Sequence, residues 1–224
     1  MNAERETFDT YELAIVLSHF DIGVIKSVRD FPRGAKRAPK LVFDATKGMF
    51  LLKRRPPGPS SDMEKIKFTH QIQLSLAAQN FPLPHLLGTR VENNSMLILD
   101  DTIYEMFEYI EGDGYSAKPG SIYHAGHTQG LFHKLLEHFK TSYTPPTGSY
   151  HDAQTIRQMT ADAPEQLNLG DDAQTAKALE LIAMIGKAYD KCADKVNQLG
   201  LPEWAKQIVH GDWHPGNMLF RNGK

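Results

Sequence analysis

The spacing of hydrophobic residues predicts a helix close to the N-terminus, followed by short strands. The helix has Asp9 or Thr10 as its cap and apolar residues at i, i+3, i+4 and i+7. These apolar residues are Leu13, Val16, Leu17 and Phe20. Runs of β type then cover 24–28, 40–45 and 49–53, and a turn with Gly48 joins the second and third runs as a hairpin.

The pattern over 62–110 completes a small sheet. A helix is expected from about Asp62 to Gln79, after a loop rich in proline. Two further strands, 96–99 and 103–110, flank a tight turn. Several strands interrupted by a single helix indicate an α+β lobe that is built on an antiparallel sheet.

Beyond Gly112 the apolar residues recur at helical spacing. One stripe consists of Leu131, Phe132, Leu135, Leu136 and Phe139, and a second of Leu179, Ile182, Gly186, Tyr189, Ala193 and Val196. The second stripe ends at Gly200, a residue typical of helix C-termini. We therefore expect two domains, an N-terminal lobe over 1–110 and a mainly helical lobe over 111–224, with a glycine-rich linker at 111–120.

Composition narrows the functional classes without choosing one. The 224 residues include 25 Lys and Arg against 27 Asp and Glu, a balance that predicts no nucleic-acid partner and no anionic membrane. The single cysteine, Cys192, excludes an internal disulfide framework and fits a reducing compartment. No apolar run has the length of a signal peptide or a membrane span, so we expect a soluble cytoplasmic protein. The pattern does not specify an oligomeric state.

The segment from Ile208 to Phe220 carries the candidate chemistry. It contains His-Gly-Asp at 210–212 and, after four more residues, Asn217, which is the spacing of a kinase catalytic loop. Phosphoryl transfer needs a carboxylate that orients the acceptor hydroxyl and accepts its proton, and a neutral oxygen ligand for Mg²⁺. An irregular loop with glycine and proline can direct both side chains to one point.

Two other interpretations of this segment stay open. His210, Asp212 and His214 could bind zinc, because two histidines at i and i+4 can ligate one metal when they lie on a helix. Gly211 and Pro215 disfavour a helix there. The segment could also be a turn that carries no chemistry.

His-Gly-Asp, four residues and Asn, entered from an apolar strand and left through Met-Leu-Phe, resembles the aminoglycoside phosphotransferase and choline kinase superfamily. The resemblance covers nearly all of 20–224 and implies a protein-kinase-like α+β fold. It implies that Asp212 is the catalytic base, that Asn217 is a metal ligand and that His210 braces the loop. The implied cofactors are ATP and Mg²⁺, and the implied partner is a small molecule with an acceptor hydroxyl, such as an aminoglycoside, choline or a homoserine-like compound.

Lys53 is the candidate phosphate-binding lysine. It follows Phe50-Leu51-Leu52 on the third strand, where kinases present their ATP-binding lysine, although it could be a surface residue of a basic run. In kinases a helix glutamate pairs with this lysine. Glu64 is available, but it also fits a capping box with Ser61, and Thr69 stands where some relatives have glutamate. The partner of Lys53 is therefore unassigned.

By the same resemblance, 104–112 contains the last strand and the hinge. The backbone of Glu108 and Ile110 is expected to hydrogen-bond adenine, and Phe107 is expected to line the pocket. A plain strand end is the alternative. The loop 32–37 lies where kinases cover the nucleotide, and an ordinary solvated hairpin loop explains it equally well.

The last residues indicate an incomplete hairpin. Asn222-Gly223 is a strong turn signal after an expected strand at 218–220, and the sequence ends at Lys224. Kinases of this type hold Mg²⁺ with a further Asp on the returning strand, so we expect truncation before that Asp. Three functional hypotheses result: an active small-molecule kinase, a pseudokinase that binds nucleotide without catalysis, and a bacterial Ser/Thr protein kinase.

Overall fold

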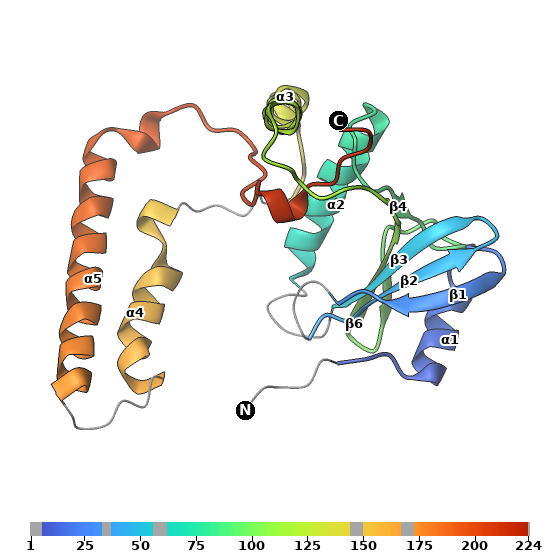
Figure 1. The fold of residues 1–224 in the computed structure, drawn as a ribbon, viewed down its shortest axis with the longest axis horizontal. Coiled ribbons are helices and arrows are strands. Elements are labelled where there is room, and N and C mark those ends of the chain that lie inside the picture. The colour runs from blue at the N-terminus through green and yellow to red at the C-terminus, as the bar shows by residue number, and fades with distance from the viewer. Residues whose placement is uncertain (1–5, 33–36, 56–61, 144–149, 167–172, 224) are drawn as a thin grey trace. The chain divides into compact units, whose positions relative to one another are not determined.

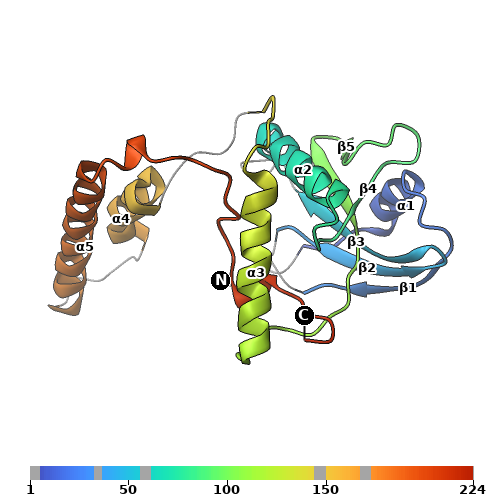
Figure 2. The ribbon, with the colours of Figure 1, turned by 90° about the horizontal axis from the view of Figure 1, so that it is seen from above.

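The computed structural model describes residues 6–32, 37–55, 62–143, 150–166 and 173–223, and the chain forms two compact units (Figures 1 and 2). One unit comprises Met1–Pro145 and Gln207–Lys224, and the other comprises Pro146–Lys206. The His-Gly-Asp segment therefore belongs to the same compact unit as the N-terminal strands. The lobe boundary near residue 110 stays a prediction.

A six-stranded antiparallel sheet forms the centre of the first unit (Figure 1). Its strands are β1 (Ile25–Asp30), β2 (Lys40–Ala45), β3 (Gly48–Arg55), β4 (Leu86–Leu87), β5 (Leu97–Leu99) and β6 (Thr102–Glu108). The strand order is β1-β2-β3-β6-β4, and β5 also pairs with β6. The chain is thus of the expected α+β class, and β2 and β3 form the expected hairpin.

The sequence pattern gives no sign of β4. This strand has only two residues, and Pro82 and Pro84 precede it closely. Two residues are too few to show the alternation by which a strand is recognised, and proline is itself a signal against a strand. Only the pairing of Leu86 and Leu87 with β6 defines β4.

Helix α1 (Thr10–Ser18) packs on one face of the sheet. Asp9 is its N-cap and forms a capping box with Glu12, as each side chain accepts a hydrogen bond from the other residue's amide. The buried members of this core are Val16, Phe20, Ile22, Phe43, Ala45, Phe50, Leu52, Leu97, Tyr104 and Met106. Burying a side chain of this size contributes about 1.5–3 kcal/mol. The face of β3 and β6 that packs against α1 therefore belongs to the hydrophobic core.

Helices α2 (Met63–Ala78) and α3 (Pro119–Leu136) share a second core. Its buried members are Phe68, Ile72, Leu76, Phe81, Phe132 and Leu136. Ile208, at the start of the candidate loop, packs against this core and is partly buried. The loop is therefore anchored to the core that α2 and α3 share.

The N-cap of α2 falls one residue later than expected. The Asp62 carboxylate accepts a hydrogen bond from the Lys65 amide at 3.3 Å, so the third helical position is Lys65 and not Glu64. Ser61, the expected cap, lies outside the described residues, and so do 33–36 of the expected nucleotide-covering loop. Asp and Ser are about equally good caps, so propensity could not choose between neighbouring positions.

The second unit is helical. It contains η2 (Tyr150–Asp152), α4 (Gln154–Gln166), α5 (Ala173–Gln198) and η3 (Leu201–Glu203). The predicted second stripe lies on α5, but α4 was not predicted, since Pro164 near its end argues against a helix. Arg157 of α4 pairs with Asp190 of α5 at 2.8 Å and with Asp152 at 2.7 Å. Across the described residues of both units, the helices are too short or too polar to cross a bilayer.

The chain after the candidate loop pairs with the chain after β6. Asp113 and Phe220 form an isolated antiparallel bridge, and the Tyr115 ring lies 6.0 Å from that of Phe220. Asn222 and Gly223 have φ angles of 53° and 76°, which is the left-handed conformation that a tight hairpin turn requires. The expected turn is therefore formed.

Candidate active site

Two bends shape the candidate catalytic loop. Gly211 has a φ of 75°, a left-handed conformation that glycine adopts more readily than other residues. Further along, Pro215–Asn217 form the 3₁₀ turn η4, whose N-cap His214 accepts a hydrogen bond at Nδ1 from the Gly216 amide at 3.0 Å. Between the two bends the chain reverses far enough to bring Asp212 beside Asn217.

Asp212 and Asn217 are in direct contact. The Asn217 Nδ2 donates to the carboxylate Oδ2 of Asp212 at 2.7 Å and to the main-chain oxygen of Asp212 at 3.0 Å. The two bonds orient the Asn217 amide, and its carbonyl oxygen stays available for another ligand. The Asp212 side chain is 72% exposed, so its carboxylate can meet a molecule from solvent. The structure brings the two residues together, while their chemical roles stay predictions.

His210 lies between the helical core and the loop. Its ring is 5.8 Å from that of Phe132 on α3 and 5.2 Å from that of Trp213. Its Nδ1 accepts a hydrogen bond from the Asp212 amide at 3.3 Å. Burial lowers the pKa of His210, and His214 adds to this, whereas the Asp212 charge opposes it. A neutral ring can accept the hydrogen bond from the Asp212 amide, and this contact is consistent with the bracing role that the resemblance implies.

The zinc interpretation of the loop has no support. Among the described residues, which include His210, Asp212 and His214, there is no group of three His, Cys, Asp or Glu side chains that could hold a metal ion. The His214 Nε2 lies 3.6 Å from Oδ1 of Asp212, and its Nδ1 is occupied by the Gly216 amide. His214 thus caps η4.

Lys53 pairs with a strand residue and not with a helix residue. On β3 it lies directly opposite Glu105 of β6, and its Nζ is 3.1 Å from the Glu105 carboxylate. Burial lowers the pKa of Lys53 more than the Glu105 charge raises it, and the nearby charges of Arg55 and Lys40 lower it further. The partner that the sequence left unassigned is therefore Glu105.

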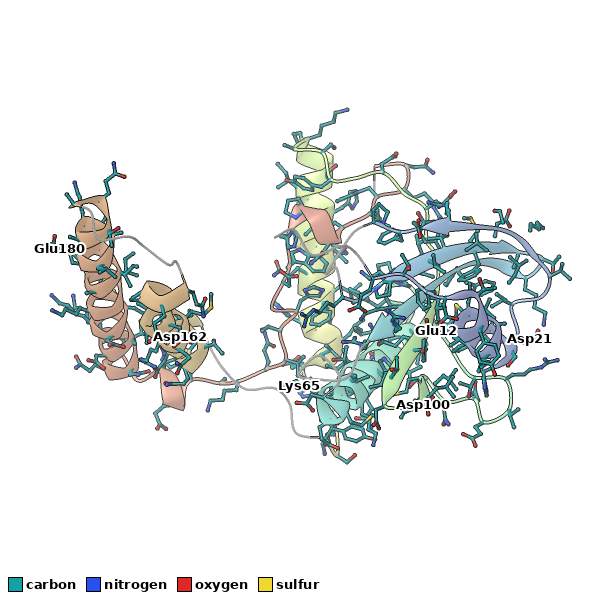
Figure 3. All side chains as sticks on the ribbon, turned by 90° about the horizontal axis from the view of Figure 1, so that it is seen from below. Glu12, Asp21, Lys65, Asp100, Asp162 and Glu180 are labelled. Carbon is teal, nitrogen blue, oxygen red and sulfur yellow. The ribbon has the colours of Figure 1, made fainter. Side chains whose placement is uncertain are left out.

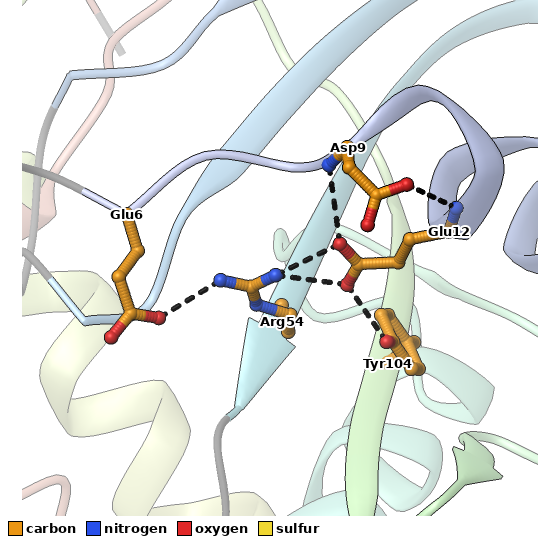
Figure 4. Close-up of polar contacts among 5 residues, drawn as sticks. All are labelled: Glu6, Asp9, Glu12, Arg54 and Tyr104. Carbon is orange, nitrogen blue, oxygen red and sulfur yellow. Dashed lines mark hydrogen bonds and ion pairs between the residues drawn. The ribbon is translucent and has the colours of Figure 1, made fainter.

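Strand alternation separates the basic run after Leu52 into two faces. Lys53 and Arg55 both contact Glu105, whereas Arg54 points to the opposite face, toward α1. There its guanidinium bonds both carboxylate oxygens of Glu12 at 2.9 Å (Figure 4). Glu12 is also labelled in Figure 3, where it lies on α1 beside the sheet. Arg54 is therefore part of the packing of α1, and Lys53 is not.

Glu12 also accepts a hydrogen bond from the Tyr104 hydroxyl at 2.8 Å (Figure 4). Burial, followed by this contact with Glu12, raises the pKa of Tyr104 to about 12. Glu6 completes the group with a bond of 2.8 Å to Arg54. This polar cluster joins α1 to β3 and β6 on the face away from Lys53.

The expected hinge begins where β6 ends. The Glu108 amide donates to the His85 carbonyl at 2.8 Å, and the Tyr109 amide donates to the Met49 carbonyl at 2.8 Å. Within the described part of the chain, no hydrogen bond holds the Ile110 amide. The Glu108 amide thus has a partner and the Ile110 amide has none among these residues, while the adenine contacts of both stay predictions.

The sequence of the chain matches one family model. Residues 27–224 match the model of the phosphotransferase enzyme family. The chain belongs to this family. No curated protein sequence matches the chain.

Solved structures similar to this phosphotransferase-family chain share its fold at low sequence identity. Amicoumacin kinase hAmiN, in complex with AMP-PNP, Ca²⁺ and Ami, has a TM-score of 0.70 and 12% identity, over 97% of this chain and 62% of that one. Spectinomycin phosphotransferase APH(9)-Ia, in complex with ADP and spectinomycin, has a TM-score of 0.63 and 15% identity, over 97% and 67%. An aminoglycoside phosphotransferase from Alicyclobacillus acidocaldarius has a TM-score of 0.51 and 15% identity, over 86% and 53%. This chain thus spans between about half and two thirds of the length of these proteins.

Sequence reasoning did not find Glu105 in this member of the phosphotransferase family. Its signal was present: Glu105 stands between Tyr104 and Met106, in a strand whose other positions are mostly apolar. A carboxylate in such a strand is expected to have a cationic partner, because an unpaired buried charge is costly. The partner became visible only through the register of β3 and β6.

Proposed function

We propose that the protein is an ATP-dependent phosphotransferase that transfers the γ-phosphate to a hydroxyl group of a small molecule. The observation that carries this proposal is the contact between Asp212 and Asn217 on a loop that leaves the Asp212 carboxylate exposed. Membership of the phosphotransferase enzyme family supports the class of reaction. Because the chain spans at most about two thirds of its structural relatives, the proposal concerns the whole protein.

Asp212 is the proposed base. Its carboxylate would accept a hydrogen bond from the acceptor hydroxyl and take its proton as the oxygen bonds to the γ-phosphorus. The bond between that phosphorus and the β–γ bridging oxygen would break, so that the products are ADP and a phosphate ester. The hydrogen bond from Asn217 keeps one carboxylate oxygen in place, while the exposure of the side chain lets the acceptor approach.

Three positions would bind the nucleotide. Lys53 would contact the phosphates, because Glu105 holds its ammonium on the face opposite α1. At the hinge, the Ile110 amide would donate to the adenine ring, and the main-chain carbonyl of Glu108 would accept from the adenine amino group. These hinge contacts use main-chain atoms, so the side chains of 108 and 110 are free to vary.

The loop also suits Mg²⁺. The side-chain nitrogen of Asn217 donates two hydrogen bonds to Asp212, which leaves the side-chain oxygen facing away from these bonds. This neutral oxygen is of the kind that ligates magnesium. When bound, Mg²⁺ would neutralise part of the phosphate charge. Asn217 would therefore hold the metal and at the same time orient the Asp212 carboxylate.

Hydroxyl-bearing metabolites and antibiotics are the proposed acceptors. An aminoglycoside, choline or a homoserine-like compound fits the family, and similar structures contain spectinomycin and Ami as ligands of those proteins. ADP release from the natural full-length protein with Mg²⁺ and ATP should appear with one acceptor from a panel of these classes. A failure of every small acceptor, together with phosphorylation of a protein substrate, would contradict the acceptor class.

The role of Asp212 is tested by Asp212→Asn in the full-length protein. Removal of the base should lower kcat by about 10²–10⁴-fold, and ATP binding should change little. Asp194→Asn is the matched control, since Asp194 is an exposed residue of α5 in the other compact unit. Turnover of the Asp212 variant at the rate of the control would contradict the proposed role of Asp212.

A further inference from the structure

A buried carboxylate organises the positive charge on one face of the sheet. The side chain of Glu105 is 1% exposed and contacts three other residues. The Lys53 Nζ lies 3.1 Å from Oε2. Arg55 donates from Nε to Oε2 at 2.5 Å and from Nη2 to Oε1 at 3.2 Å. The His70 Nε2 lies 2.8 Å from Oε1. Each oxygen of the carboxylate therefore has at least two partners.

These partners keep Glu105 ionised. Burial alone would raise the pKa of Glu105, but the hydrogen bonds from His70 and Arg55 and the charge of Lys53 outweigh it and hold that pKa below its usual range. An ionised carboxylate only accepts hydrogen bonds. The hydrogen between Glu105 and His70 must consequently be carried by Nε2 of His70.

The contact of the other ring nitrogen of His70 is compatible with this tautomer. His70 Nδ1 lies 2.8 Å from the hydroxyl oxygen of Ser95, so in the neutral ring Nδ1 accepts the Ser95 hydroxyl while Nε2 donates to Glu105. His70 itself is 3% exposed and projects from α2. The contacts form a line from Ser95 through His70 to Glu105 and then to Lys53.

In protein kinases the partner of the strand lysine is a glutamate on the neighbouring helix, and the pair forms only when that helix is in place. In this protein Lys53 and its carboxylate partner lie on adjacent paired strands, so the ion pair is internal to the sheet. Helix α2 supplies His70 in place of the carboxylate itself. This arrangement gives the helix an indirect connection to the lysine.

We propose that Glu105 and His70 are positioning residues for Lys53: Glu105 holds the ammonium, and His70 holds Glu105 in the rotamer that does so. The use of the placed Lys53 ammonium for phosphate binding rests on the proposed function. Its placement does not, because the contacts of Lys53, Glu105 and His70 lie within the chain. Ser95 contributes by holding the His70 ring in its orientation.

The test measures Lys53 without any nucleotide. The rate at which acetic anhydride acetylates Lys53 is followed by mass spectrometry from pH 7 to 11, with the exposed Lys26 as internal reference. Glu105→Gln removes the charge that raises the pKa of Lys53, so that pKa should fall. At a given pH below the pKa, each unit of fall gives about tenfold more of the neutral amine, which is the form that reacts. We expect at least about threefold faster labelling of Lys53 in Glu105→Gln and in His70→Leu.

His70→Gln is the matched variant. Its amide nitrogen can donate to Glu105 in place of Nε2, so labelling of Lys53 should stay close to that of the natural protein. If His70→Leu does not fold, Ser95→Ala replaces it, since this change removes only the hydroxyl that holds the His70 ring in its orientation, and it should also accelerate the labelling. An unchanged Lys53 profile in the folded His70→Leu or Ser95→Ala protein overturns the proposal, as does an equal change in His70→Gln and His70→Leu.

Nucleotide affinity separates this proposal from the proposed function. The dissociation constant of ATP, measured by calorimetry on the same full-length proteins, should rise about threefold or more in His70→Leu and stay nearly constant in His70→Gln. A natural protein that binds no ATP, but labels as expected, would overturn the proposed function and leave the positioning of Lys53 established. A natural protein that binds ATP with the same affinity as His70→Leu would overturn the positioning role.

Discussion

Asp113 and Phe220 exchange both main-chain hydrogen bonds, each at 2.8 Å, although one follows the sheet and the other follows the candidate catalytic loop. This bridge joins the hinge segment to the residues that leave the loop. Its formation requires close approach, because the neighbouring Gly112 lies against Phe220 and Leu219. The bridge is thus one of the contacts that place Asn217 relative to the sheet.

Gly112→Ala should disturb this bridge. The added Cβ would lie 2.9 Å from the Phe220 carbonyl oxygen and 3.2 Å from the Leu219 Cβ, so the chain must shift. We expect the free energy of unfolding to fall by about 1–3 kcal/mol, and kcat to fall as the loop moves. Gly114→Ala is the control, since its Cβ would meet nothing within 4 Å. Equal melting temperatures and rates for the two variants would contradict this role of Gly112.

Lys53→Met and Arg54→Met should have different effects, although the residues are adjacent. Loss of Lys53 removes the proposed phosphate contact, so the ATP dissociation constant should rise about tenfold or more with a small change in melting temperature. Loss of Arg54 removes the guanidinium nitrogen that bonds both carboxylate oxygens of Glu12 and should lower the free energy of unfolding by about 1–3 kcal/mol. Calorimetry and thermal unfolding measure the two effects. The same response from both variants would mean that strand alternation does not separate their roles.

Glu105→Gln should change the dependence of stability on pH. The folded-state pKa of Glu105 lies below its unfolded value of about 4.3, so its charge stabilises the fold above that pH, and this contribution is lost as the pH falls toward the folded-state pKa. At pH 7 the variant should lose about 3–5 kcal/mol, because Arg55 and Lys53 lose their buried counter-charge.

Chemical denaturation at pH 7 and pH 3 measures this difference. The gap between the natural protein and Glu105→Gln should narrow at the lower pH. Glu64→Gln on α2 is the control, since Glu64 is exposed and its removal should leave the pH dependence unchanged. A gap of constant size at both pH values would mean that the folded-state pKa of Glu105 does not lie below its unfolded value.

Asn217→Ala should raise the concentration of Mg²⁺ needed for half-maximal ADP release by about 10–100-fold. The variant loses the proposed metal ligand and also the hydrogen bond that orients Asp212. Excess Mg²⁺ should therefore restore the rate only in part. ADP release measured against Mg²⁺ concentration checks both expectations, and an unchanged half-saturation point would exclude Asn217 as a metal ligand.

Local pattern was sufficient for most of the fold. The start of α1, predicted at Asp9 or Thr10, the hairpin of β2 and β3, and the long helix α5 each depend on residues close together in the sequence. Spacing and turn residues therefore predicted them, and the structure selects Asp9 as the cap. The same holds for the contact of Asp212 with Asn217, which a single loop creates. Local pattern did not predict α4, because Pro164 disfavours a helix. Packing of α4 on α5 outweighs that local preference.

The pairing of Lys53 with Glu105 could not be predicted in the same way. It depends on the register between β3 and β6, and Glu105 comes much later in the chain than Lys53. The nearby helix offered Glu64, which fits the usual kinase arrangement and drew attention away from the strand. A search for carboxylates in otherwise apolar strands would have identified Glu105, but it would not have identified His70 as the contribution of α2.

Strand β3 serves two purposes at once, because adjacent residues on it face opposite ways. Its even-numbered residues Leu52 and Arg54 attach the sheet to α1, and its odd-numbered residues Lys53 and Arg55 meet Glu105. Deleting one residue before Leu52 would exchange the two sets, turning Lys53 toward the apolar core and Arg54 toward the buried carboxylate. Evolution can therefore replace individual residues in this strand, but it cannot change the strand's length by one without losing the packing and the proposed phosphate contact together.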